Sequence, residues 1–171
     1  MPKDWQLSEN LEDYLEVILE LEKSNKVARA KDIAERIGVQ SASVTGALKT
    51  LDKKGLINYE PYSFVTLTSK GAKIAKQITR NHNVLENFLI NVLQIDHKTA
   101  NETACRMEHA ITEEATERLV AFIDFIYNCP KAGEGWIQSF IVDCAKDERD
   151  WQKCTTCIET CNKNHLGTTE K

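Results

Sequence analysis

Three segments of this sequence carry side chains that together could bind a divalent metal ion. Cys105, Glu108 and His109 stand at i, i+3 and i+4, a spacing that places all three side chains on one face of a helix. Two further pairs also have helical spacing: His82 with Glu86, and Asp13 with Glu16. Thiolate, carboxylate and imidazole groups are the ligand types that transition metals use. The pattern therefore predicts a metal site assembled from three helices.

Each segment taken alone also has an ordinary interpretation. Asp13 could complement the N-terminus of its helix, Glu86 could be a solvated surface charge, and Cys105 could be a small core residue. Cys105 could also be the nucleophile of an enzyme, with His109 or His82 as its base. No strand-to-helix elbow or Gly-rich oxyanion loop accompanies these residues, so we predict that the chain is not an enzyme.

A second group of possible ligands lies near the C-terminus. It comprises five of the six cysteines: Cys129, Cys144, Cys154, Cys157 and Cys161. The last three combine CxxC and CxxxC spacing, which suits Zn(II) or an iron–sulfur cluster, with His165 as an extra donor. Thiol–disulfide redox pairs and unligated thiols are the alternatives that the spacing leaves open.

Apolar spacing and capping residues predict the elements that must position these side chains. The expected elements are a helix around 11–19, helices over 30–37 and 42–54, strands over 56–59 and 64–67, a helix from 68 to about 92, and helices over 98–110 and 112–127. The expected N-caps are Asn10 or Ser8, Ser41, and Thr68 or Ser69, with Gly38 and Gly55 as helix ends. The apolar stripe of the last helix is Leu119, Phe122, Ile123 and Ile126.

The order helix, short helix, tight turn, helix, hairpin is typical of a winged helix-turn-helix, in which the helix after the turn enters the DNA major groove. Polar and basic side chains suited to phosphates and base edges lie on and around that helix: Arg29, Gln40, Ser41, Ser43, Thr45, Lys49, Lys53 and Tyr62. Winged helices also serve as protein-interaction modules. Charge favours DNA, because residues 23–80 hold 12 Lys and Arg against four acidic residues, a formal charge of +8.

Composition sets the remaining bounds. The chain has 171 residues, 42% of them hydrophobic and 28% charged, so it can form a core. The net charge of −4 leaves −12 outside residues 23–80 once their +8 is set apart. No apolar run approaches the ~18 residues of a membrane span. The start, Met-Pro-Lys-Asp-Trp, lacks a signal-peptide layout. We therefore expect a cytoplasmic protein with no membrane partner.

The arrangement of these motifs resembles the metal-dependent repressors typified by the diphtheria toxin repressor and the manganese transport regulator. The resemblance runs from about Leu7 to Ile126. It is carried by Leu11-Glu12-Asp13-Tyr14-Leu15-Glu16, Asp32-Ile33-Ala34-Glu35, Ser43-Val44-Thr45, Leu67-Thr68-Ser69-Lys70-Gly71, His82 with Leu85-Glu86, and Ala104-Cys105-Arg106-Met107-Glu108-His109.

The resemblance implies a hybrid ligand set. Asp13 and Glu16 match ligands of the manganese branch, whereas Cys105 falls where the iron branch has Cys and the manganese branch has Glu. His82, Glu108 and His109 each match a ligand that both branches use. Glu86 matches an ancillary ligand of the iron branch, but Asn101 stands where that ancillary site has His, which puts the ancillary site in doubt.

Ligand softness then bears on the metal. A thiolate favours Fe(II) over Mn(II), so Cys105 favours Fe(II), unless Cys105 binds only through its backbone carbonyl. Mn(II) remains the alternative.

The resemblance implies a mainly α fold with a winged helix-turn-helix DNA-binding domain that has a small β wing (1–75) and an all-helical metal-binding and dimerisation domain (76–128). A Cys-rich extension (129–171), which the resemblance does not cover, follows them. The resemblance implies that the protein is a homodimeric transcriptional regulator that controls metal homeostasis genes. We expect it to be a repressor that binds promoter DNA when it is loaded with Fe(II) or Mn(II). The alternative is a winged-helix regulator that senses redox state through the C-terminal cysteines.

Overall fold

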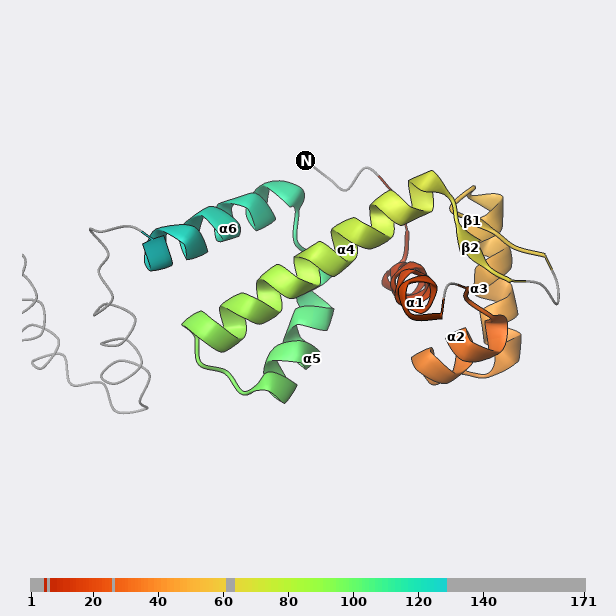
Figure 1. Ribbon diagram of the computed structural model, residues 1–171, viewed down its shortest axis with the longest axis horizontal. Helices are drawn as coiled ribbons and strands as arrows, with labels where there is room; N and C mark the ends of the chain where they lie inside the picture. The colour runs from red at the N-terminus through yellow and green to blue at the C-terminus, as the bar shows by residue number, and fades with distance from the viewer. Residues whose placement is uncertain (1–4, 6, 26, 61–63, 129–171) are drawn as a thin grey trace, which may run out of the picture.

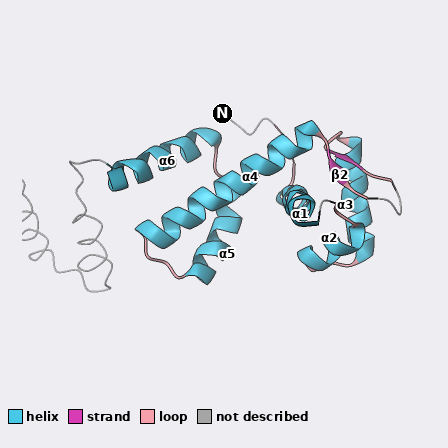
Figure 2. Ribbon diagram, in the orientation of Figure 1, coloured by secondary structure: helices cyan, strands magenta, loops and turns pink. Residues whose placement is uncertain are grey.

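The described residues of the computed structural model, 5, 7–25, 27–60 and 64–128, form helices and one small sheet (Figure 1 and Figure 2). This confirms the predicted mainly α fold class. Several predictions fall outside the described residues: Tyr62, Cys129, Cys144, Cys154, Cys157, Cys161 and His165. None of the helices in the described ranges is long and apolar enough to cross a membrane.

The N-terminal half has the topology of a winged helix-turn-helix. Its elements are α1 (Glu9–Asn25), α2 (Ala30–Ile37), α3 (Ser41–Lys53), β1 (Ile57–Asn58) and β2 (Thr66–Leu67). The two strands pair antiparallel, with Ile57 opposite Leu67, and they lie beside α3 (Figure 1). Gly38 ends α2 with φ of 77°, a left-handed conformation that favours glycine, and its N–H donates to the Ala34 carbonyl. This tight turn sends the chain into α3.

The predicted apolar stripes form the core of this half. The buried side chains of α1 and α3 are Tyr14, Leu15, Ile18, Leu19, Val44, Leu48 and Leu51. Ile74 and Ile78 of the next helix belong to the same buried cluster. The winged unit is therefore packed against the helix that leaves it.

That helix, α4 (Ser69–Asn87), joins the two halves. Thr68 caps it by accepting from the Gly71 N–H, as predicted. The chain continues through a π-helical turn, η1 (Phe88–Val92), into α5 (His97–Glu108) and α6 (Glu113–Asn128). α4 contacts α1, α5 and α6, and Figure 1 shows it running from the winged unit to the region flanked by α5 and α6. A second, smaller core forms where Leu85 and Leu89 meet Ala100 and Ala104.

Several boundaries differ from the predictions for local reasons. α3 begins at Ser41 because Gln40, in extended conformation, is the N-cap, and its carbonyl accepts from the N–H groups of Ser43 and Val44. α5 begins at His97 because the Asp96 carboxylate caps it through the Thr99 N–H. Each strand has two residues where four were expected, and the last turn of the long helix is π-helical.

The apolar stripe predicted for α6 is not all buried. Ile126 is buried, whereas Phe122 is 44% exposed and meets only one ring, that of Phe88, in the described part of the chain. The division at 75/76 stays a prediction, and α4 runs across it.

Gly71 and Gly46 provide a matched test of this packing. A Cβ at Gly71 would lie 1.9 Å from the Leu56 carbonyl oxygen, whereas a Cβ at Gly46 would meet nothing within 4 Å. Gly71→Ala should therefore lower the free energy of unfolding by about 3 kcal/mol or more, because backbone must move. Gly46→Ala should raise it by about 1 kcal/mol, since alanine is the better helix former. Urea unfolding measures both, and equal stability of the two variants would contradict the close contact of Leu56 with α4.

Candidate metal centre

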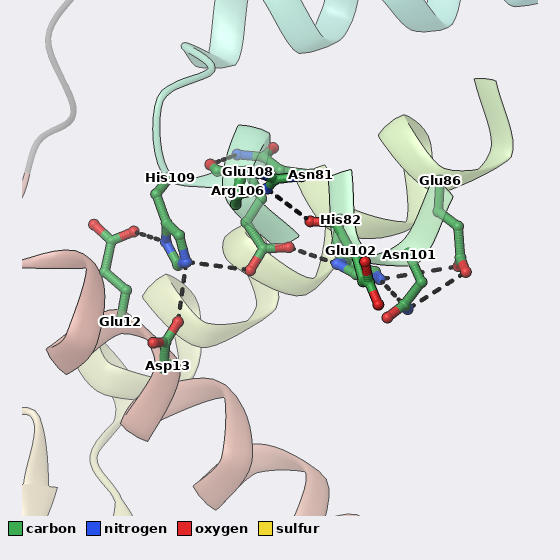
Figure 3. A network of polar contacts seen from close by, with 10 residues as sticks. All are labelled: Glu12, Asp13, Asn81, His82, Glu86, Asn101, Glu102, Arg106, Glu108 and His109. Atoms are coloured by element: carbon green, nitrogen blue, oxygen red, sulfur yellow. Dashed lines mark hydrogen bonds and ion pairs between the residues drawn. The ribbon is translucent and has the colours of Figure 1, made fainter. Parts of the chain in front are cut away.

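The predicted ligands gather where α1, α4 and the C-terminal end of α5 meet (Figure 3). Asp13 comes from α1, His82 from α4, and Cys105 and Glu108 from α5. His109 is the C-cap residue of α5. Helical spacing alone placed the side chains of each segment on one face, and helix packing brings the three faces together.

Glu108 lies at the centre of the group and is fully buried. Its Oε2 lies 2.6 Å from His82 Nδ1, and this hydrogen bond raises the pKa of His82. Its Oε1 lies 3.4 Å from His109 Nε2 and has no hydrogen-bond partner among the described residues. The His109 ring is at ion-pair distance, but a buried carboxylate oxygen without a hydrogen-bond donor is costly, so this atom is a candidate ligand for a bound cation.

His109 faces carboxylates on both edges of its ring. Its Nε2 lies 3.0 Å from Asp13 Oδ1, and its Nδ1 lies 2.8 Å from Glu12 Oε2. Hydrogen bonds to Asp13 and then Glu12 raise the pKa of His109 to about 10. In the metal-free protein this imidazole is therefore a cation at neutral pH, and it joins α1 to the end of α5.

Two sets of donor atoms are close enough to share a metal ion. One consists of Asp13, Glu108 and His109, and the other of His82, Cys105 and Glu108. Within each set the atoms lie within 4.8 Å of one another, and Glu108 belongs to both. The nitrogen, oxygen and sulfur donors, together with the unpartnered Glu108 Oε1, fit a divalent transition metal.

Cys105 is a free and exposed thiol. Partial burial of the sulfur and the charge of Glu108 raise its pKa to about 11. A nucleophilic cysteine needs a lowered pKa, so this environment opposes the enzyme interpretation.

The same environment predicts that the Cys105 thiol reacts slowly with alkylating reagents. At pH 7.5 the metal-free protein should carry about 100-fold less thiolate at this residue than an unperturbed thiol, because its pKa is raised to about 11 from an ordinary value of 9.0. Iodoacetamide labelling, followed by peptide mass spectrometry of the segment around Cys105, measures the rate against free cysteine. Labelling as fast as that of free cysteine would contradict the raised pKa.

Two of the predicted ligands lie beside these sets rather than within them. Burial and the charge of Glu108 raise the pKa of Glu16. Glu86 Oε2 lies 3.9 Å from His82 Nε2, and its Oε1 accepts from the Asn101 amide at 3.5 Å. The Asn101 nitrogen also lies 3.3 Å from His82 Nε2, so an amide occupies the place where the resemblance expects the histidine of an ancillary site.

The structure adds three polar residues that the sequence predictions missed: Glu12, Asn81 and Thr116, all buried. Asn81 donates to the Glu108 backbone carbonyl at 3.4 Å, and Thr116 donates to Asn81 Oδ1 at 3.2 Å. Glu12 had a sequence signal, because it stands at i−3 and i−7 from Leu15 and Leu19 on the apolar face of its helix. A carboxylate in an apolar stripe indicates a buried partner.

The predicted DNA contacts that the structure describes lie on the surface of the winged unit. Arg29, Gln40, Ser41, Ser43, Lys49 and Lys53 are exposed, and Thr45 is half-buried. The Arg29 guanidinium stacks over the exposed ring of Phe64 at 5.3 Å. These side chains are available to a partner.

Comparison with known proteins matches both halves. The profile described as the iron dependent repressor N-terminal DNA binding domain covers residues 6–65, and that of the metal binding and dimerisation domain covers residues 68–137. A helix-turn-helix-type transcriptional regulator of Methanocaldococcus jannaschii is 39% identical over 69% of this chain and 95% of its own length. The chain belongs to the iron-dependent repressor family. The family consists of metal-dependent, DNA-binding transcriptional regulators rather than enzymes.

Further members of the iron-dependent repressor family show the same likeness. The regulator MntR of Bacillus subtilis is 34% identical over 68% of this chain and 81% of its own length. The structure of the manganese regulator SloR has a TM-score of 0.62 and 31% identity, and covers 72% of this chain and 58% of its own. The structure of IdeR from T. acidophilum has a TM-score of 0.60 and 27% identity, over 70% and 55% of the two chains.

Proposed function

We propose that this repressor-family protein binds Fe(II) or Mn(II) between α1, α4 and α5 and thereby gains affinity for promoter DNA as a homodimer. The observation that carries the proposal is the pairing of His109 Nε2 with Asp13 Oδ1 at 3.0 Å beside the unpartnered Glu108 Oε1. Asp13 belongs to the winged unit, whereas Glu108 and His109 belong to α5 and its C-cap. A metal held by all three would join the two halves.

The proposed ligands are Asp13, Glu108 and His109 in one set, and His82 and Cys105 with Glu108 in the other. We propose that Glu16 and Glu86, which lie beside these sets, provide further ligands to the bound metal. The bound ion would supply positive charge that offsets the carboxylates and fixes the distance between the halves. Because the two recognition helices of a dimer must match DNA half-sites, metal would favour the competent arrangement by population shift.

Dimerisation is supported by the matched domain and by the surface of α6. Three aromatic side chains of α6 are about half exposed: Phe122 (44%), Phe125 (51%) and Tyr127 (50%). Exposed apolar surface is unfavourable in water, and a partner subunit would cover it. We propose that Arg29, Gln40, Ser41, Ser43, Thr45, Lys49, Lys53 and Tyr62 contact the DNA, and that the protein acts in the cytoplasm as a repressor of metal homeostasis genes.

The identity of the metal rests on Cys105. The matched family profiles are named for iron, and the SloR structure is that of a manganese regulator. A thiolate ligand favours Fe(II), and we propose Fe(II) as the preferred ion. For the C-terminal cysteines the proposal of a Zn(II) or iron–sulfur site rests on spacing alone.

Fluorescence anisotropy tests the proposed function. Double-stranded DNA selected from a random library by the Mn(II)-loaded protein serves as the probe, titrated without metal, with Mn(II), and anaerobically with Fe(II). We expect metal to raise the DNA affinity at least tenfold, and Asp13→Ala to abolish that rise while the metal-free affinity stays unchanged. Glu9→Ala, an exposed acid of the same helix, is the control. Equal affinity of the wild type with and without metal would refute the proposal, and a response to oxidant alone would favour the redox alternative.

A further inference from the structure

The carboxylate of Glu12 lies behind the His109 ring, on the side away from Asp13 and Glu108 (Figure 3). It is buried, with 3% of its surface exposed. Its Oε2 lies 2.8 Å from His109 Nδ1, whereas Asp13 and Glu108 lie 3.0 and 3.4 Å from Nε2, the other ring nitrogen. Glu12 is therefore separated from the donor sets by the imidazole itself.

Both Glu12 oxygens are already engaged by nitrogen atoms. Oε1 accepts from the indole N–H of Trp5 at 3.0 Å, and Oε2 pairs with His109 Nδ1. Among the described residues, two sets of donor atoms could hold a metal, and Glu12 belongs to neither of them. Asp13, Glu108 and His109 form the nearer set. Its position indicates a hydrogen-bond acceptor for the ring rather than a ligand.

We propose that Glu12 is a positioning residue that fixes the orientation and tautomer of His109 for metal binding. The inference rests on the proposed function, in which His109 is a ligand. A neutral imidazole carries one N–H, and the proton stays on the nitrogen that faces an acceptor. Carboxylates face both ring nitrogens in the metal-free protein, so the role of Glu12 arises when a metal ion binds Nε2. The one remaining proton then stays on Nδ1, where Glu12 accepts it. A carboxylate behind the ring also makes the imidazole a more basic ligand.

The two donors explain why this position holds a glutamate. An ionised carboxylate has two acceptor oxygens and serves Trp5 and His109 together. A glutamine has one acceptor oxygen and an NH₂ group, so Glu12→Gln would turn a donor toward either the indole N–H or the imidazole N–H. The substitution keeps the volume of the side chain and removes one of the two hydrogen bonds, which makes it a sharp probe.

The contact also spans the joint between the two halves. Glu12 belongs to α1, and His109 follows α5. Asp13, the next residue of α1, faces the opposite ring nitrogen, so the two neighbouring carboxylates hold the ring from both edges. The orientation of His109 is therefore set by the winged unit.

Metal affinity and the imidazole tautomer test the role of Glu12 on the full-length protein. Competition of Mn(II) with a chromophoric chelator gives the affinity, and ¹⁵N histidine spectra of the Zn(II)-loaded protein give the tautomer, since Zn(II) is diamagnetic. We expect Glu12→Gln to weaken Mn(II) binding by about 10- to 100-fold, the usual cost of losing such an outer partner. We also expect the Nδ1–H form of His109 to predominate in the wild type and to be less populated in Glu12→Gln.

Two control variants separate positioning from packing. Glu9→Gln changes an exposed carboxylate of the same helix and should leave both readouts unchanged. Trp5→Phe removes the donor to Oε1 but keeps the His109 contact, so it should retain the tautomer and bind Mn(II) as Glu9→Gln does. Thermal melts of the metal-free variants show whether each is folded. If Glu12→Gln is unfolded, Glu12→Asp replaces it, because aspartate keeps two acceptor oxygens on a shorter side chain. Glu12→Asp is also expected to weaken Mn(II) binding.

The outcomes distinguish this inference from the proposed function. If the wild type binds no Mn(II), the proposed function fails, and the inference fails with it. If the wild type binds Mn(II), and a folded Glu12 variant binds it equally well with the same His109 tautomer, Glu12 is a packing residue and only the inference is overturned.

Discussion

Glu108→Gln is expected to reduce metal affinity by at least about 100-fold. This loss exceeds that expected when a residue that only hydrogen-bonds a ligand is replaced. Glu108 is the one residue shared by the two sets of donor atoms that could hold a metal among the described residues. The substitution removes the buried negative charge and leaves an amide beside His82 and His109, so both sets lose their central anion. Chelator competition with Mn(II), and anaerobically with Fe(II), measures the effect.

A matched control exists on the same helix. Glu102 is exposed on α5, and Glu102→Gln should bind metal as the wild type does. The metal-free Glu108→Gln protein should remain folded by circular dichroism, because an amide removes a buried charge and can still hydrogen-bond His82. Metal binding within threefold of the Glu102→Gln control would show that the metal binds elsewhere.

Metal affinity is also expected to rise steeply with pH. The pKa of His109 is raised to about 10 in the metal-free protein, so at pH 6–8 the ring must lose a proton before Nε2 can bind a cation. Mass action then makes the apparent affinity rise about tenfold per pH unit for each proton released. Calorimetry of Mn(II) binding in buffers of different ionisation enthalpy counts these protons. Binding without proton release at pH 7 would contradict ligation by His109.

The same measurement addresses how Cys105 binds. Its pKa, raised to about 11, means that a thiolate ligand must also release a proton, whereas a backbone carbonyl ligand releases none. Wild-type protein should therefore release one proton more than Cys105→Ser if the sulfur is a ligand. Because sulfur favours Fe(II), this proton count bears directly on the preferred metal.

The metal-free protein should respond to pH in the opposite direction. The folded pKa of His109, about 10, exceeds the ordinary histidine value of 6.5, so its pairing with Asp13 and Glu12 stabilises the fold fully below pH 6.5. That contribution is lost as pH rises through about 10, at roughly 1.4 kcal/mol per pH unit at most. Urea unfolding at pH 6, 8 and 10 should show this loss in the wild type and not in His109→Gln.

Several features of the fold followed from local sequence chemistry. The apolar periodicity of Leu15 and Ile18, the left-handed turn at Gly38 and the Thr68 cap are set by neighbours within one or two turns of helix. The same locality placed Cys105, Glu108 and His109 together, since i, i+3 and i+4 share a face. The predicted N-cap of α3, Ser41, was wrong by one residue, because Gln40 is the N-cap. Moving the start of a helix by one residue changes the free energy little.

The sequence by itself determined which donors exist, which segment carries each, and that residues 23–80 carry a formal charge of +8 in a chain whose net charge is −4. Only the tertiary structure decided which donors meet. It centred the site on Glu108, brought Glu12 behind His109, and set Asn101 between His82 and Glu86. These contacts join residues 15 to 97 positions apart, and the packing of α1, α4 and α5 fixes them. Helical spacing specifies a face of one helix, but how that face meets another depends on side chains throughout the core.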